Sequence, residues 1–208
     1  MYKALSSLYF STCFCCGSFF VKNHFFCDSC FATKINNKLS LRSNIYIPSH
    51  SYLIKWVPEE SDLLSNYIYA LKGIKGKRAW IFYAKLISEQ LKSQYDLIIP
   101  IPSQKRFSKH AHFFAESVAE HLGVPYLVIL RRAGANKYQK TLRKDDRKEV
   151  EFQRSEHFTT VDLTQKRVLL VDDILTTGSS FKAAQLSLGP TVATDLITLF
   201  YRELKRPV

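Results

Sequence analysis

Short apolar runs alternate with longer amphipathic stretches along most of this chain. The apolar runs are rich in Val, Ile and Leu, as expected of strands that are buried on both faces. The amphipathic stretches repeat apolar residues at helical spacing. The predicted strands are Leu97–Ile101, Tyr126–Leu130, Val168–Val171 and Val192–Phe200, and the predicted helices are Ser61–Lys72, Lys77–Leu91 and Ala111–Leu122. This alternation indicates an α/β fold with a doubly wound, mostly parallel sheet.

The strand Val168–Val171 is followed directly by two acidic residues, Asp172 and Asp173. Ligands of open α/β sheets bind outside the carboxyl ends of the strands, so we expect both carboxylates at the rim of the sheet and not in its core. There they can accept hydrogen bonds from sugar hydroxyls or hold hydrated Mg²⁺. Thr176–Ser180 then offers hydroxyl and backbone N–H groups, and Gly178 lets the backbone approach an anion at a helix N-terminus. This order favours a site for ribose and its 5′-phosphate.

Three other kinds of structure also place acidic residues after a strand. A nucleoside-triphosphatase needs a G-x-x-x-x-G-K-[ST] loop, and the nearest segment, Gly73–Lys77, has the wrong spacing. A phosphorylated receiver domain has its acidic pocket near the start of the domain, whereas this pair lies late in the sequence. An ordinary turn uses Asp, Ser or Thr only to cap a helix. The full order of apolar strand, Asp-Asp and Thr-Thr-Gly is more specific than these patterns and favours the phosphosugar site.

All five cysteines of the chain lie near its N-terminus. Two C-x-x-C pairs can close a tetrahedral zinc site, and Gly17 suits the turn after the first pair. The predicted ligands are Cys13, Cys16, Cys27 and Cys30. Cys15 is left over as a free thiol or alternative ligand, and His24 is a second alternative ligand. An iron–sulfur cluster stays open as the other metal centre.

Neither an export signal nor a membrane-spanning stretch is evident in the sequence, because the early apolar run Leu8–Phe10 is too short. We therefore expect a cytoplasmic protein, in which disulfides are disfavoured. We also expect two domains, a four-cysteine zinc finger at 1–45 and an α/β domain at 46–208. The boundary falls in Lys38–Pro58, where Ile45–Ile47 is predicted to form a linking strand.

The chain is strongly basic. Its 208 residues include 30 Lys and Arg against 18 Asp and Glu, a net charge of +12. Such a field attracts polyanions, and basic grooves with interleaved aromatic residues hold single-stranded nucleic acid. The candidate nucleic-acid residues form one run: Arg131, Arg132, Lys137, Lys140, Arg143, Lys144, Arg147 and Lys148.

The segment Val168–Ser180, VLLVDDILTTGSS, resembles the phosphoribosyl-pyrophosphate (PRPP) motif of type I phosphoribosyltransferases. The resemblance implies that Asp172 and Asp173 contact the ribose hydroxyls and that Mg²⁺ accompanies PRPP. It assigns the 5′-phosphate to Thr176, Thr177, Gly178 and Ser179, and the pyrophosphate to Ser103, Lys105 and Arg106.

Together with the cysteine pairs, this motif resembles the ComF (competence protein F) family. Tyr67–Lys72 is similar to the early helix of that family, Ile99–Pro102 to its Pro-x-Pro strand, and Gln139–Leu142 with the later Arg147 to its Gln-x-x-Leu-x-x-x-x-Arg segment. The chain departs from the family at Lys109–His112, where Arg-Gly-Phe-Asn is usual, and at Val150, where an Asn is expected.

The ComF resemblance implies a protein that handles incoming single-stranded DNA during natural transformation. It also implies partnership with a competence helicase and with the DNA channel of the inner membrane, where the protein would be peripheral. The alternative is an active phosphoribosyltransferase that moves ribose 5-phosphate from PRPP to an acceptor. The acidic pair and its loop favour ligand binding in both cases.

Overall fold

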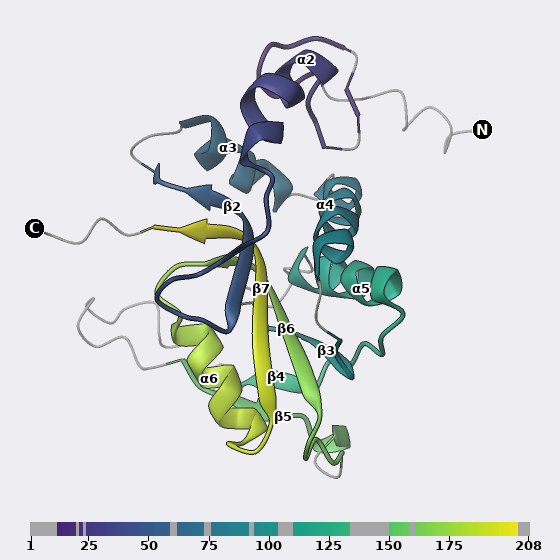
Figure 1. Ribbon diagram of the computed structural model, residues 1–208, viewed down its shortest axis with the longest axis vertical. Helices are drawn as coiled ribbons and strands as arrows, with labels where there is room; N and C mark the ends of the chain where they lie inside the picture. Colours follow the sequence, from purple (N-terminus) through teal and green to yellow (C-terminus); the bar gives the residue numbers. More distant parts are fainter. Residues whose placement is uncertain are drawn as a thin grey trace, which may run out of the picture.

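The computed structural model describes residues 12–19, 21–22, 24–58, 62–72, 76–91, 94–103, 110–133, 150–158 and 161–203. Figure 1 shows the central strands with helices on either side, and the cysteine-containing segment beyond α3 and α4. The helices are α2 (Asp28–Cys30), α3 (Asp62–Leu71), α4 (Lys77–Gln90), α5 (His110–Leu122) and α6 (Ser179–Leu188). The strands are β1 (Arg42–Ser43), β2 (His50–Trp56), β3 (Leu97–Pro100), β4 (Leu130–Arg132), β5 (Phe152–Arg154), β6 (Arg167–Leu175) and β7 (Ala193–Arg202).

The main sheet has the strand order β1-β2-β7-β6-β3. β2, β7, β6 and β3 are parallel, and only the short edge strand β1 is antiparallel. Val171 of β6 lies opposite Pro100 of β3 on one side and Ile197 of β7 on the other. Because these strands are parallel, the segments that follow β3 and β6 emerge at the same edge of the sheet.

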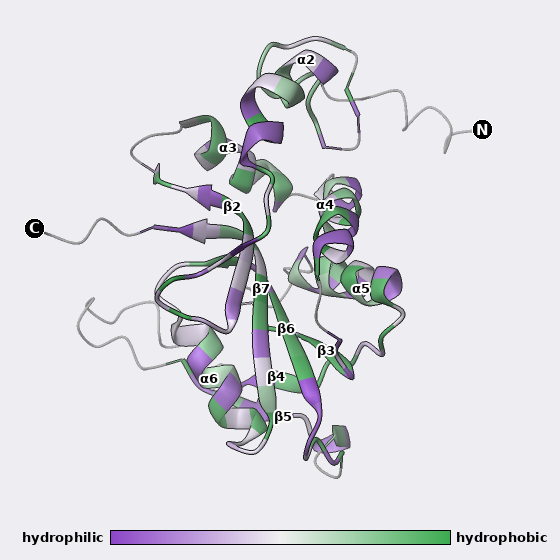
Figure 2. Ribbon diagram, in the orientation of Figure 1, coloured by the Kyte–Doolittle hydropathy of each residue, from purple (hydrophilic) through white to green (hydrophobic). Residues whose placement is uncertain are grey.

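Two hydrophobic clusters cover the two faces of the sheet. On one face, Trp80 and Tyr83 of α4 and Phe114 of α5 share a buried cluster with Leu169 and Val171 of β6. On the other face, the apolar residues of α6 pack with the alternate residues of β6, which include Val168 and Leu170. Figure 2 accordingly shows β6 as hydrophobic along most of its length. Burial on both faces explains why this strand has an uninterrupted apolar sequence.

The predicted strand Tyr126–Leu130 is wrong in position. Tyr126 makes only an isolated parallel bridge with Ile98, and the strand β4 begins at Leu130. β4 then pairs antiparallel with β5 in a separate two-stranded sheet, in which Arg132 lies opposite Phe152. The apolar run before Leu130 therefore forms a connecting segment. The position of β4 is set by its pairing with the distant strand β5.

The predicted linking strand Ile45–Ile47 is also wrong. These residues form a turn between β1 and β2, and β2 begins at His50. The side-chain oxygen of Asn44 accepts hydrogen bonds from the backbone N–H groups of Tyr46 (2.8 Å) and Ile47 (3.3 Å). A side chain that takes over backbone hydrogen bonds in this way favours a turn over a strand.

The predicted fold class is confirmed: the protein is an α/β structure with a mostly parallel sheet and an N-terminal cysteine cluster. The three long helices before β4 lie within one residue of their predicted ends. Within the described ranges, no helix has both the length and the apolar character that crossing a membrane requires.

Candidate functional site

The acidic pair lies inside β6 and not after it, because β6 continues to Leu175. Asp172 pairs in register with Thr198 of β7. Successive side chains of a strand point to opposite faces, so the two neighbouring carboxylates have different surroundings. Asp173 faces α3 and α5, whereas Asp172 lines a pocket with the residues that follow β6.

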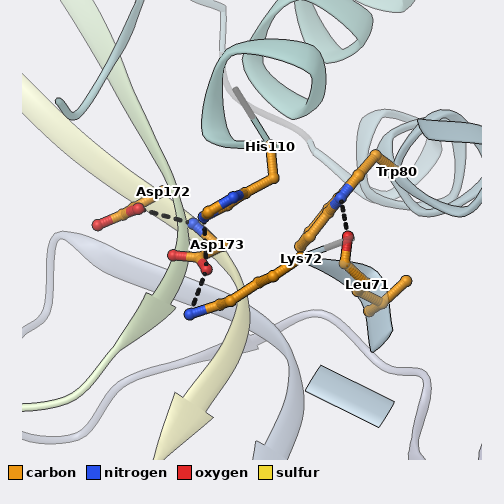
Figure 3. A network of polar contacts seen from close by, with 6 residues as sticks. All are labelled: Leu71, Lys72, Trp80, His110, Asp172 and Asp173. Carbon is orange, nitrogen blue, oxygen red and sulfur yellow. Dashed lines mark hydrogen bonds and ion pairs between the residues drawn. The ribbon is translucent and has the colours of Figure 1, made fainter. Parts of the chain in front are cut away.

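Asp173 is buried, with 6% of its surface exposed, so the prediction that both carboxylates lie at the rim is wrong for this residue. One carboxylate oxygen lies 2.9 Å from the Lys72 ammonium and 3.1 Å from Nε2 of His110 (Figure 3). Burial alone would raise the pKa of Asp173, but His110 and Lys72 hold it well below its usual range. The carboxylate is therefore charged and compensated within the protein.

A tryptophan holds the two side chains that contact Asp173. The indole of Trp80 in α4 stacks on the His110 ring, with a centroid distance of 6.0 Å and an interplanar angle of 23°. The same indole N–H donates a hydrogen bond of 3.0 Å to the carbonyl of Leu71, next to Lys72 (Figure 3). Trp80 thus fixes the end of α3 and the start of α5 around one carboxylate.

Asp172 has the opposite electrostatic character. Burial and the neighbouring charge of Asp173 raise its pKa well above the usual range. Its side chain accepts a hydrogen bond of 2.8 Å from the backbone N–H of Asp173. These surroundings disfavour its charged form, so a cation or a hydrogen-bond donor from a ligand would be stabilised here.

Arg132 lies near Asp172. Burial lowers the pKa of Arg132, while the negative charge of Asp172 acts in the opposite direction. The guanidinium Nε donates a hydrogen bond to the carbonyl of Pro102 (3.4 Å), and its Cζ lies 5.3 Å from the ring centroid of Phe152. The structure places Arg132 at the sheet edge of the acidic pair, and its contact with nucleic acid stays a prediction. Arg132 lies in β4, where it is paired in register with Phe152 of β5.

The loop after β6 has the conformation expected of an anion site. Gly178 has φ of +81° and precedes the first residue of α6. The Thr177 and Ser179 hydroxyl oxygens are 3.0 Å apart, and both residues, like Thr176, are exposed. With Asp172 they line a pocket of ≈ 30 Å³. This volume accepts a single small group, so the loop can contact one end of a ligand whose remainder lies outside.

The segment after β3 emerges beside Asp172, as predicted. The backbone N–H of Ile101 donates to the carbonyl of Val171 (2.9 Å), and Ile101 lines the pocket. Ser103 follows at the same edge. Lys105 and Arg106 lie outside the described residues.

Of the predicted nucleic-acid run, the structure describes only the first two residues. Arg131 is exposed and forms an ion pair of 2.9 Å with Glu156. The remaining candidates, Lys137, Lys140, Arg143, Lys144, Arg147 and Lys148, lie outside the described residues.

The four predicted metal ligands come together. The Sγ atoms of Cys13, Cys16, Cys27 and Cys30 lie within 4.8 Å of one another. The Sγ atoms of Cys16 and Cys27 are 3.7 Å apart, and a tetrahedral site with Zn–S bonds of ~2.3 Å requires sulfur separations of roughly 3.8 Å. Gly17, with φ of +75°, closes the first turn by donating to the Cys13 carbonyl (2.9 Å). The donor set therefore fits one zinc ion.

The two alternative ligands lie outside this cluster. Cys15 is exposed, and no disulfide joins any of the five cysteines. His24 is buried and stacks on Phe31 at 3.8 Å, while its Nδ1 accepts the backbone N–H of Phe26 (3.3 Å). The backbone carbonyl of His24 accepts the Tyr67 hydroxyl (2.9 Å), which joins the cysteine segment to α3. His24 thus has a structural role in packing.

Comparison with known proteins finds no matching protein-family model and no matching curated protein. Among solved structures, the chain is similar to adenine phosphoribosyltransferase from Leishmania tarentolae, with 14% identity and a TM-score of 0.45 over 78% of this chain and 94% of that chain. It is similar to the Saccharomyces cerevisiae enzyme with 17% identity and a TM-score of 0.42, over 83% and 89% of the two chains. A purine phosphoribosyltransferase from Pyrococcus horikoshii shows 18% identity and a TM-score of 0.39, over 62% and 93%.

The first prediction concerns the metal. Purified protein should contain one zinc ion per chain by elemental analysis. Replacing Cys13 and Cys16 with Ser should abolish zinc binding and unfold the N-terminal segment, because metal binding supplies its folding energy. The matched control is Cys15→Ser, which changes an exposed thiol outside the cluster and should retain the zinc. Zinc-free protein, or equal zinc content in all variants, contradicts this prediction.

The second prediction contrasts the two acids by the same substitution. Asp173→Asn should lower the free energy of unfolding by about 3 kcal/mol, because it leaves Lys72 and His110 without their counter-charge. Asp172→Asn should leave stability unchanged or increase it at about pH 8, because its raised pKa means that the charged form destabilises the folded state.

The pH dependence follows from the signs of the two shifts. The contribution of Asp172 is fully present below the unfolded pKa of about 3.9 and is lost as pH rises through its folded pKa, so any gain from Asp172→Asn should vanish near pH 4. The contribution of Asp173 is present above that unfolded value and is lost only in stronger acid. Denaturant unfolding at the two pH values measures both effects. Equal destabilisation by the two substitutions contradicts the division of roles.

Proposed function

We propose that this protein binds a 5-phosphorylated ribose, PRPP foremost, together with Mg²⁺ at the carboxyl edge of β6. One observation carries the proposal: the Asp172 carboxylate and the positive-φ Gly178 loop line the same pocket at the start of α6. A carboxylate beside a phosphate-binding turn matches the two ends of a ribose 5-phosphate. The phosphoribosyltransferase motif of the sequence supports the same ligand.

Each part of the site has a role in this proposal. The backbone N–H groups and hydroxyls of Thr176–Ser179 bind the 5′-phosphate, aided by the positive end of α6. Asp172 accepts hydrogen bonds from the ribose hydroxyls or holds hydrated Mg²⁺, which binds proteins through few carboxylates and keeps several waters. Ser103, Lys105 and Arg106 are proposed for the pyrophosphate. Arg132 contributes positive charge near Asp172.

In this proposal Asp173 binds no ligand directly. Its carboxylate is already paired with Lys72 and His110 inside the protein. Its role is to hold the β6 edge, from which Asp172 projects. This assignment differs from the expectation that both carboxylates contact the ribose.

A thermal-shift titration tests the ligand. PRPP or ribose 5-phosphate with Mg²⁺ should raise the melting temperature, because a ligand at about a hundredfold its Kd stabilises the native state by about 2.7 kcal/mol. Asp172→Asn should abolish the shift without unfolding the protein. The control Glu120→Gln changes an exposed acid on α5, and this variant should still show the thermal shift. A shift that survives in Asp172→Asn places the ligand elsewhere.

We propose further that the protein handles single-stranded DNA in natural transformation, as its similarity to the ComF family suggests. The supporting observation is the distribution of charge: residues 131–148 contain eight basic and two acidic residues within a chain of net charge +12. A competence helicase and an inner-membrane DNA channel are the partners in this proposal. The alternative, transfer of ribose 5-phosphate to an acceptor, is separated by an assay for pyrophosphate release.

Single-stranded DNA should bind with little sequence preference and with a steep dependence on salt, at about −0.7 log units per log salt for each phosphate neutralised. Replacing the four basic residues Arg143, Lys144, Arg147 and Lys148 with Glu should weaken binding and flatten that slope in an anisotropy titration. A control with the same change in net charge replaces four exposed lysines elsewhere: Lys34, Lys38, Lys85 and Lys166. Equal loss in both variants would assign binding to overall charge and not to this run.

A further inference from the structure

A buried polar network lies beside the candidate site and takes no part in the roles described above. It begins at Asn44, which is 3% exposed and whose side-chain oxygen caps the turn at Tyr46 and Ile47. The side-chain nitrogen of Asn44 lies 3.0 Å from Nδ1 of His50, and Nε2 of His50 lies 2.8 Å from the Thr198 hydroxyl. The network therefore joins the turn before β2 to the middle of β7.

The hydrogen-bond directions in this network follow from where the Thr198 hydroxyl places its proton. The Thr198 hydroxyl donates to the carbonyl of Phe200 (2.9 Å), so it must accept from Nε2–H of His50. Nδ1 of His50 is then the acceptor for the Asn44 amide N–H, and the imidazole is neutral. Burial agrees with this state, because it lowers the pKa of His50 to about 4.

His50 is enclosed by aromatic rings. Tyr52 stacks on it with a centroid distance of 5.7 Å, and Tyr201 meets it edge-on at 5.8 Å. The imidazole is 0% exposed, so its two nitrogens can satisfy their hydrogen bonds only within the protein. Removing any member would leave a buried polar atom unpaired.

Both ends of the network reach the candidate site. Thr198 is the register neighbour of Asp172. At the other end, a methyl group placed on Gly178 would lie 3.2 Å from Cδ1 of Ile47. The Ile47 side chain therefore packs directly against the Thr176–Ser179 loop. Ile45 and Tyr46 are 80% and 54% exposed. Ile47 packs against the hydrophobic cluster that contains α6. The Asn44 cap, together with the backbone hydrogen bond from the His50 N–H to the Ile47 carbonyl (2.9 Å), sets where Ile47 lies.

We propose that Asn44 and His50 are positioning residues for the phosphosugar site. Through the capped turn they hold Ile47 against Gly178, which keeps the Thr176–Ser179 loop in its anion-binding conformation. The affinity part of this inference rests on the proposed function, whereas the support of the loop by the network does not. Neither residue contacts the ligand.

The test compares a variant that breaks the cap with one that retains it. In zinc-loaded full-length protein, Asn44→Ala removes the acceptor for both backbone N–H groups and should weaken ribose 5-phosphate binding with Mg²⁺ by about tenfold in calorimetry. Asn44→Asp keeps an acceptor for the turn and can pair with a protonated His50, so its affinity should stay within about twofold. If Asn44→Asp retains the affinity that Asn44→Ala loses, the effect comes from the lost hydrogen-bond acceptor of the turn.

A second control separates positioning from general destabilisation. Val192→Ala opens a small cavity in the same hydrophobic cluster, at the end of α6 that lies away from the loop. It should lower the melting temperature as Asn44→Ala does while leaving affinity unchanged. Wild-type affinity in Asn44→Ala, or an equal loss in Val192→Ala, overturns the positioning role.

Hydrogen exchange measures the loop without any ligand. Amide exchange at Thr177–Ser180 should accelerate in Asn44→Ala, but not in Asn44→Asp or Val192→Ala. If the unsubstituted protein fails to bind both ribose 5-phosphate and PRPP, the proposed function fails. The exchange data still decide whether the network supports the loop, and unchanged exchange in Asn44→Ala overturns that support.

Discussion

The buried charge of Asp173 is the constraint on which the candidate site depends. A carboxylate removed from water is costly unless cations and hydrogen bonds replace the solvent. Lys72, which directly follows α3, and His110, the first residue of α5, meet this requirement. Trp80 contacts the His110 ring and the carbonyl of Leu71 beside Lys72. One unsolvated carboxylate therefore ties α3, α4 and α5 to β6. If these helices moved away from β6, the Asp173 carboxylate would lose the partners that compensate its charge.

Asp172, the neighbour of Asp173, has no part in these ion pairs and faces the candidate pocket. Because successive side chains of a strand alternate between faces, Asp172 projects from one face of β6 while Asp173 is compensated on the other. Its own charge is disfavoured by burial and by Asp173. An acid in this condition lowers the stability of the unliganded protein and gains most from a bound cation. Proteins commonly carry such strain at functional sites and compensate for it elsewhere.

The helix α3 connects the two parts of the molecule that the sequence distinguishes. Its residue Tyr67 donates a hydrogen bond to the backbone of His24 in the cysteine segment, and its C-terminal neighbour Lys72 pairs with Asp173. Phe26 of the cysteine segment shares the same buried cluster as α4 and α5. The cysteine segment is thus packed on the core that also supports the site, although their sequence motifs lie far apart.

The features that depend on local order could be predicted from the amino-acid sequence. The spacing of the cysteine pairs brought their four sulfur atoms together, and the succession of apolar run, acids and Thr-Thr-Gly placed Asp172 beside the Gly178 loop. The features that depend on partners distant in sequence arose only from tertiary packing. β6 extends past its acids because β7 pairs with it, and Asp173 is buried because Lys72 and His110 meet it there. Local patterns determine what a segment can form, but only packing supplies the counter-charges and neighbouring strands that fix how each side chain is used.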